Sequence, residues 1–226
     1  MQHFLDIKNR VAFRRIFGTD KNKEFLISFF NNILEFDKSA QLVDVLFLSK
    51  NAALDMLEVL CKLSNGTEMV VAMDVISQGD GRKDAPYISK LCDAQSNKRK
   101  ELLNRHKALM AIVFMYICNF SAFGEEQGAN YINYFTAPLK EPIQGLPKKF
   151  SFVIVDLSKF QIKHVENLTD MMQKWAYVLK YAPTTVKEEV SVIAGKDTVI
   201  ERVYEELNPL NWSEQELQMY EVANKR

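Results

Sequence analysis

The sequence is poor in the residues that build disulfide frameworks and zinc clusters. Its three cysteines, Cys61, Cys92 and Cys118, are odd in number and show no paired spacing, which argues against both kinds of site. Its three histidines lie far apart and show no ligand spacing. These absences favour a reducing compartment, and we therefore expect a cytoplasmic protein.

The chain also lacks an excess charge and a long apolar run. Its 29 basic and 29 acidic residues cancel, so DNA affinity would need a local basic patch. The longest apolar stretch, 108–118, is shorter than a membrane span of about 20 residues. No secretory signal is evident, because Asp6, Lys8 and Arg10 stand where such a signal has an apolar run. We expect a globular protein that does not enter a membrane.

The stretch 57–78 has the pattern of a β-hairpin. From Leu57 to Leu63 apolar residues alternate with Glu58, Leu60 and Lys62, as expected of a strand. Asn65 and Gly66 suit a tight turn, since both tolerate positive φ. A second strand is predicted from Met69 to Ile76, and residues two apart on it, such as Ala72 and Asp74, would point to one face.

This hairpin resembles that of the PD-(D/E)XK nuclease family transposases, also called recombination-promoting nucleases. The resemblance covers nearly the whole chain. It includes Phe4-Leu5-Asp6 and Val11 to Gly18 near the start, and Asp156 to Phe160, Lys174-Trp175 and Glu214 to Tyr220 later. It implies an α/β, restriction-endonuclease-like core in which helices flank a mixed β-sheet, and a Mg²⁺-dependent DNA endonuclease linked to mobile elements and recombination.

The positions that would carry catalysis differ from the family pattern. Glu58 stands where the family has the strand Asp, Ala72 where it has the Glu of Glu-x-Gln or Glu-x-Lys, and Asp74 where it has the Gln or Lys. Arg10 replaces the acid of an opening Asn-Asp pair, and Asp84 stands where an Arg usually follows the hairpin. Natural divergence explains this set better than a deliberate change at position 72 alone, and the set favours impaired catalysis.

Nucleases of this type use carboxylates to hold Mg²⁺, which polarises the phosphate and lowers the pKa of the attacking water. Glu58 and Asp74 are the candidate catalytic residues and metal ligands, because they could converge if the two strands pair around the turn. Lys62 or Gln78 could orient the water. The competing interpretation, which we weight somewhat higher, is that Glu58 and Asp74 are solvated polar residues on a half-exposed face.

A dense basic cluster is the candidate for nucleic-acid contact. It contains Lys98, Arg99, Lys100 and Arg105, and such groups give sequence-independent affinity for phosphates. A solvated helix end is the more common explanation of such a run. The functional alternatives are a non-catalytic pseudonuclease that binds DNA or a partner protein, and an interaction module that forms a homodimer through residues 121–149 or the C-terminal helices.

The order of predicted elements is helices, then strands interrupted by one helix, then helices again. Further strands are predicted near 108–118 and 150–157, and residues 121–149 have the composition of a long connection. Asp20 can cap the second helix, and Ser213 with Glu216 forms a capping box for the last one. We expect a nuclease-like core over residues 1–160 and a helical C-terminal lobe over 161–226, with Trp175 in the packing of that lobe.

Overall fold

The computed structural model describes residues 4–48, 56–76, 111–121, 130–137 and 149–224. Its contacts divide the chain into two compact units. The helical unit contains Met1–Glu35 and Phe160–Arg226, and the sheet unit contains Phe36–Lys159. Among the described residues, no helix combines the length and the apolar character that a membrane crossing requires.

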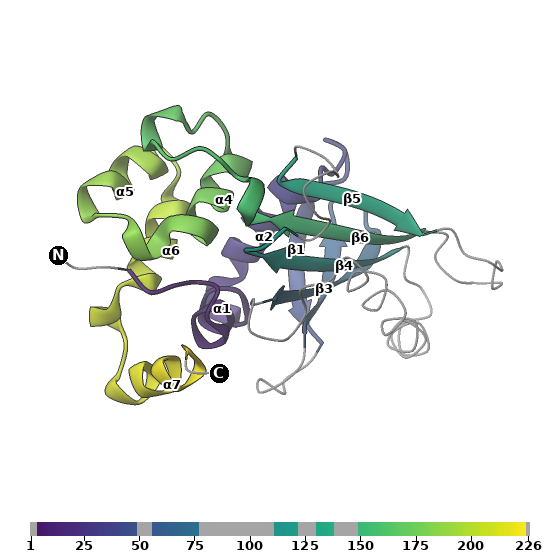
Figure 1. Ribbon diagram of the computed structural model, residues 1–226. Helices are drawn as coiled ribbons and strands as arrows, with labels where there is room; N and C mark the ends of the chain where they lie inside the picture. The colour runs from purple at the N-terminus through teal and green to yellow at the C-terminus, as the bar shows by residue number, and fades with distance from the viewer. Residues whose placement is uncertain (1–3, 49–55, 77–110, 122–129, 138–148, 225–226) are drawn as a thin grey trace. The chain divides into compact units, whose positions relative to one another are not determined.

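The sheet unit is a six-stranded mixed sheet (Figure 1). Its strands are β1 (Leu42–Phe47), β2 (Leu57–Leu63), β3 (Glu68–Ile76), β4 (Ala111–Cys118), β5 (Ile132–Ala137) and β6 (Lys149–Asp156). They lie in the order β1-β2-β3-β4-β6-β5. The pairs β3–β4 and β4–β6 are parallel, and the other three are antiparallel.

The hairpin of β2 and β3 forms as the sequence predicts. Gly66 has a φ of +81°, which a residue without Cβ adopts readily. The amide of Gly66 donates to the carbonyl of Leu63, and the Asn65 side chain accepts from both the amide and the hydroxyl of Thr67. These local bonds close the turn and fix the register of the two strands.

The parallel strands are apolar on both faces, as buried parallel strands usually are. β4 lies within the predicted 108–118 segment and β6 matches the predicted 150–157 segment to within a residue at each end. One face of the sheet carries a cluster of buried apolar side chains that includes Val70, Ala72, Phe114, Tyr116 and Phe152. The rings of Phe114 and Phe152 stack at 5.8 Å between centroids.

The stretch 121–149 is not only a connection, as its composition suggested. It contains β5, which pairs antiparallel with β6 from Ile132↔Val155 to Ala137↔Phe150. The prediction was wrong here because the glycines and prolines around a six-residue strand dominate the local composition. The pairing that stabilises the strand is with β6, which begins 12 residues further along the chain.

The helical unit joins the start of the chain to its end. Its α-helices are α1 (Arg10–Phe17), α2 (Lys23–Ile33), α4 (Met171–Tyr181), α5 (Lys187–Ala194), α6 (Thr198–Leu207) and α7 (Glu214–Asn224). Short 3₁₀ turns lie between them at Asp20–Asn22, Val165–Asn167, Ala182–Thr184 and Pro209–Asn211, and another, Leu157–Lys159, follows β6. The chain is therefore an α/β protein, as expected.

An aromatic cluster forms the centre of the helical unit. Trp175 is fully buried, as the sequence predicted, and its ring lies 5.3 Å from that of Phe29 and 5.7 Å from that of Phe17. Its indole N–H donates to the hydroxyl of Ser28 at 3.1 Å. Residues of α1 and α2 thus pack on α4, although the expected division into domains put α1 and α2 with the sheet. That division stays a prediction.

Of the two helix caps expected from the sequence, one forms and one does not. The capping box of α7 is present, since the Ser213 amide donates to Glu216 at 2.8 Å and the Glu216 amide donates to the Ser213 hydroxyl at 3.3 Å. Asp20 does not cap α2. It begins a 3₁₀ turn instead, and Asn22 precedes α2 without a side-chain hydrogen bond to it.

Candidate functional site

Glu58 lies on β2 directly opposite Ala72 on β3. Residues paired in this way in an antiparallel sheet point to the same face, with Cβ atoms roughly 4.5–5.5 Å apart. Glu58 is only 1 % exposed and Ala72 is fully buried. The hairpin therefore brings together the two positions at which the resemblance expects acids, and one of them is an alanine.

Asp74 lies on the same face as Ala72, one pleat further along β3. Because Glu58 pairs with Ala72, Asp74 and Glu58 are diagonal neighbours roughly 7–8 Å apart, with their Cβ atoms somewhat closer. On its other side Asp74 pairs with Tyr116 of β4. Asp74 is half-buried, and its Oδ1 accepts from the amide of Val75 at 2.9 Å. The burial of Glu58 differs from the half-exposed face that the competing interpretation assumed.

The face around Glu58 is apolar. Ala72, Val70 and Phe114 belong to one buried cluster, and Leu60 packs against it. Electrostatic interactions are stronger in apolar surroundings than in water. A buried charge is nevertheless costly unless other groups pair with it or donate hydrogen bonds to it. A carboxylate at position 72 would enter this apolar face next to Glu58.

The acids of the sheet are the candidate ligands for a magnesium ion. Mg²⁺ takes oxygen ligands in octahedral geometry and is usually held by one or two carboxylates with several waters. No group of three or more Asp, Glu, His or Cys side chains that could hold a metal lies within the described ranges. Another buried acid, Asp156, ends β6, beside Cys118 of β4, and accepts from the amide of Ser158 at 3.0 Å. Glu58 and Asp74 are two carboxylates on one face of the sheet, but Ala72 stands directly opposite Glu58, and the assignment of Glu58 and Asp74 as ligands stays a prediction.

The candidate water-orienting residue Lys62 lies far from Glu58. It is exposed and pairs with Glu68 at the turn end of the hairpin. It lies four positions along β2 from Glu58, which is roughly 13 Å at the usual rise per residue. Gln78, Asp84, Lys98, Arg99, Lys100 and Arg105 lie outside the described residues.

The model of one protein family, the PD-(D/E)XK nuclease family transposases, matches residues 7–226. The chain belongs to this family. Comparison with curated proteins and with solved structures found no match. The match confirms the family that the hairpin resembles and the α/β, restriction-endonuclease-like fold class that this family implies.

Two cysteines lie on strands of the sheet, Cys61 on β2 and Cys118 on β4, and a cysteine thiolate can act as a nucleophile. Cys61 and Cys118 are free and buried, and burial raises the pKa of each thiol to about 12. A thiol rather than a thiolate is a weak nucleophile and a weak metal ligand. These two cysteines therefore lie in the sheet as buried thiols.

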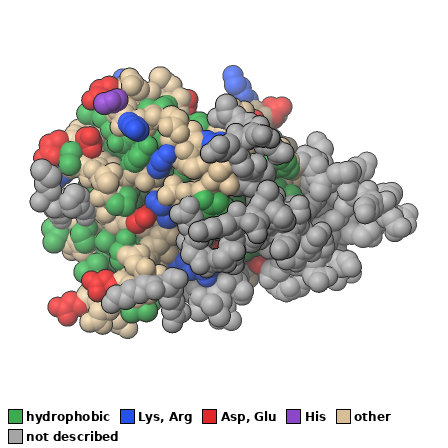
Figure 2. Space-filling model, viewed as in Figure 1, with side chains coloured by type: hydrophobic (Ala, Val, Ile, Leu, Met, Phe, Trp, Pro, Cys, Tyr) green, Lys and Arg blue, Asp and Glu red, His purple; other side chains and the backbone are tan. Residues whose placement is uncertain are grey.

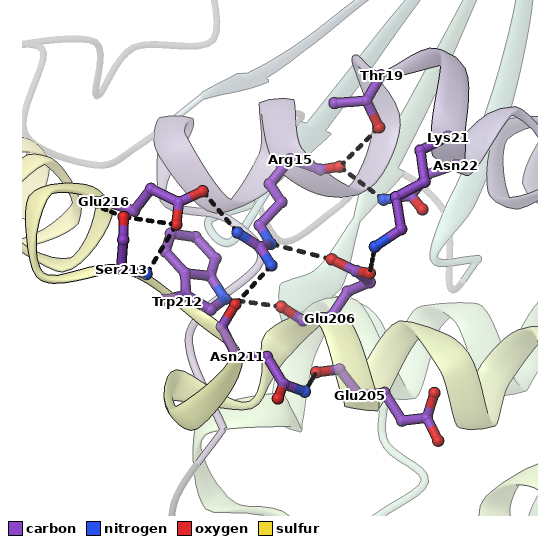
Figure 3. A network of polar contacts seen from close by, with 10 residues as sticks. All are labelled: Arg15, Thr19, Lys21, Asn22, Glu205, Glu206, Asn211, Trp212, Ser213 and Glu216. Carbon is purple, nitrogen blue, oxygen red and sulfur yellow. Dashed lines mark hydrogen bonds and ion pairs between the residues drawn. The ribbon is translucent and has the colours of Figure 1, made fainter.

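The helical unit contains a network of charged groups around Arg15 (Figure 3). The sequence did not predict this network. Arg15 of α1 donates to Glu206 of α6 at 3.0 Å and to Glu216 of α7 at 2.6 Å, and Lys21 also pairs with Glu206. The guanidinium group lies 4.7 Å from the ring centre of Trp212. No local pattern signals these contacts, because Arg15 is 191 residues from Glu206 and 201 from Glu216.

A cavity and the exposed basic side chains are two further features of the molecule. A cavity of about 210 Å³ lies in the helical unit, lined by residues that include Phe4, Lys187, Glu201 and Tyr204, so it does not contain the hairpin acids. On the face shown in Figure 2, the described Lys and Arg side chains form separate spots and not one patch. The described residues on this face therefore show no basic groove. The predicted basic cluster near residue 100 lies outside the described residues.

Proposed function

We propose that this chain is a divergent transposase-family protein that keeps the nuclease fold and acts on DNA with impaired phosphodiester hydrolysis. The observation that supports the proposal is the pairing of Glu58 with Ala72. The family's Glu at this position would face the strand acid across the hairpin. In this chain a methyl group of the apolar cluster stands there.

The chemical argument follows from what hydrolysis demands. A phosphodiester gains negative charge as water attacks, and metal ions held by acids supply the compensating charge. With one of two facing carboxylates absent, a cation would depend on Glu58 and the diagonal Asp74. We therefore expect weak Mg²⁺ binding and slow or absent cleavage. Mg²⁺ as the ion and DNA as the substrate are part of the proposal, and both are supported by family membership.

The first test restores the family pattern. Cleavage of supercoiled and linear DNA with Mg²⁺ or Mn²⁺ is measured for the natural chain and for the double variant Ala72→Glu, Asp74→Gln. We expect activity in the double variant to exceed that of the natural chain by about a hundredfold or more, the range that one charge-stabilising group contributes in other enzymes. The matched control is Ala72→Gln with Asp74→Gln, which adds similar volume without the new charge.

The same assay separates impaired catalysis from a site whose acids have moved. The observation favouring a moved site is that Asp74 shares the face of Glu58. In that case the natural chain cleaves DNA, and Glu58→Gln or Asp74→Asn abolishes cleavage while circular dichroism shows an intact fold. Robust cleavage by the natural chain would overturn the proposal of impaired hydrolysis.

A pseudonuclease that binds DNA or a partner protein is the alternative function. Both edge strands of the described sheet expose apolar side chains that suit protein contact. On β5 these are Tyr134, 44 % exposed, and Phe135, 41 % exposed, and on the β1 edge they are Val43, 52 % exposed, and Leu46, 57 % exposed. A homodimer through this edge would appear as a doubled mass in light scattering, and Leu46→Lys would remove it. DNA binding would instead weaken steeply with salt, because phosphate contacts release counterions. Binding of neither kind would leave this alternative without support.

The cellular location of the chain is part of the same proposal. Cys61 and Cys118 are free and do not form a disulfide with each other. Proteins of oxidising compartments often use their cysteines as disulfides. We therefore assign the chain to the cytoplasm, and fractionation of cells that express it checks this assignment.

A further inference from the structure

The last helix, α7, buries little apolar surface. Of its 11 residues only Tyr220 is buried, whereas Met219 is 53 % and Val222 55 % exposed. Helices in proteins usually gain most of their stability from packing an apolar face. For α7 that contribution is small, so other contacts must hold it.

Polar groups hold the first turn of α7. The Glu216 carboxylate accepts from Arg15 through Oε1 at 2.6 Å and from the amide and hydroxyl of Ser213 through Oε2, both at 2.8 Å. One carboxylate thus completes the helix cap and also joins α7 to α1. Arg15 in addition donates to the carbonyl of Asn211 at 2.8 Å, just before α7 begins.

Polar groups also hold the end of α7. The side-chain amide of Asn9 donates to the carbonyl of Tyr220 at 2.9 Å and to the side chain of Asn224 at 2.7 Å. The Tyr220 hydroxyl accepts from the amide of Asp6 at 2.8 Å. The carboxyl end of α7 therefore lies against the amino end of α1, an arrangement in which the two helix dipoles attract.

We propose that α7 is a latch that opens from the helical unit while α2 and α4 stay folded, with the Arg15–Glu216 contact controlling how often it opens. Segments with few buried apolar contacts open locally at a lower free-energy cost than the core does. The contrast within this unit is large, since α2 and α4 each bury five side chains and meet in the aromatic cluster of Trp175. Opening would expose Trp212 and the amino end of α1, which makes the latch a candidate point of regulation.

Hydrogen–deuterium exchange of the full chain tests the latch. In the natural protein we expect the amides of α7 to exchange at least about tenfold faster than those of α2 and α4. Glu216→Gln keeps a residue that can complete the capping box but removes the charge that Arg15 contacts. We expect this variant to speed exchange in α7 by a further threefold to tenfold and to leave α2 and α4 unchanged.

The matched control is Glu214→Gln, an identical change in the same helical turn at an exposed position that has no contact with Arg15 among the described residues. It should leave exchange in α7 within a factor of two, which separates the Arg15 contact from a general effect of charge on the helix dipole. Equal acceleration by both variants would overturn the role of Arg15. Exchange of α7 as slow as that of α2 and α4, or acceleration of all helices together in Glu216→Gln, would overturn the latch itself.

Discussion

Glu206 and Glu58 are both carboxylates with little exposure to solvent, and they differ in what lies opposite them. Glu206 of the helical unit, with 14 % of its side chain exposed, pairs with Arg15 and Lys21. Glu58 of the sheet unit is 1 % exposed and faces Ala72 across the hairpin. The helical unit therefore surrounds its acid with cations, as a structural site does, whereas the sheet buries Glu58 at a position where the resemblance expects a catalytic acid.

The difference indicates that different interactions surround the buried acids of the two units. Partnered charges and a packed aromatic cluster stabilise the helical unit whatever its function. The hairpin places positions 58 and 72 face to face, and position 72 is an alanine. Strand register and side-chain chemistry are determined by different residues, so a fold can be kept while the side chains at a site differ.

The largest effect should come from breaking the core of the helical unit. Trp175→Ala would leave a void beside Phe17 and Phe29 and remove the hydrogen bond to Ser28. We expect a loss of about 3–5 kcal/mol in the free energy of unfolding. Urea unfolding followed by circular dichroism measures it, with Trp175→Phe as the control that keeps an aromatic ring. A loss below about 1 kcal/mol in Trp175→Ala would show that the cluster does not organise the unit.

The next effect should come from adding the missing acid to the sheet. Ala72→Glu would bury a carboxyl group in an apolar face beside Glu58, and we expect a loss of about 2–4 kcal/mol. Burial raises the pKa of the introduced carboxyl group, so the native state binds more protons than the unfolded state. The destabilisation should be small below about pH 4 and should grow as the pH rises above the ordinary pKa of Glu.

A metal ion should reverse part of that loss if the restored pair can hold one. Thermal unfolding of Ala72→Glu at pH 7.5 is compared with and without Mn²⁺, and Ala72→Gln is the control without charge. We expect Mn²⁺ to raise the midpoint of Ala72→Glu and to leave the control and the natural chain unchanged. Equal shifts in all three proteins would mean that the ion binds elsewhere.

An intermediate loss of stability should come from removing the charge of Arg15 in the helical unit. Arg15→Met would cost about 1.5–3 kcal/mol, the usual range for hydrogen bonds to charged groups. Because both tryptophans lie in this unit, tryptophan fluorescence during urea unfolding reports on it. Arg10→Met, an exposed arginine of the same helix, is the matched control and should cost less than about 0.5 kcal/mol.

The same network predicts a dependence on pH. Burial raises the pKa of Glu206, but hydrogen bonds and charges from Lys21 and Arg15 outweigh it and hold this pKa below its usual value. Hydrogen bonds from Ser213, followed by the charge of Arg15, lower the pKa of Glu216. Carboxyl groups with a lowered pKa in the folded state stabilise it above their ordinary pKa of about 4.5, and this stabilisation is lost as the pH falls through the lowered value. The natural chain should therefore lose more stability than Arg15→Met between pH 5 and 3.

Local signals and distant contacts account for what the sequence could and could not predict. The alternation of β2 and the Asn65-Gly66 turn predicted the hairpin, because these signals act within a few residues. The place of β5 and the partners of Arg15 could not be predicted, since each depends on segments that folding brings together from far along the chain. At the candidate site the facing positions followed from the register, but the local alternation grouped Glu58 with Lys62, which is exposed, and so did not signal that Glu58 is buried.

The smallest effect should come from the turn that determines this register. At Gly66 a Cβ atom would meet no atom within 4 Å, so Gly66→Ala tests only the cost of a φ of +81°. That cost is about 1–2 kcal/mol for a residue with a side chain, and Gly66→Asn should recover part of it because Asn tolerates the left-handed region. Hydrogen exchange of the β2 and β3 amides measures both variants. If Gly66→Ala instead shifted the pairing by one residue, Glu58 would no longer face Ala72, and the site would depend on its turn as much as on its acids.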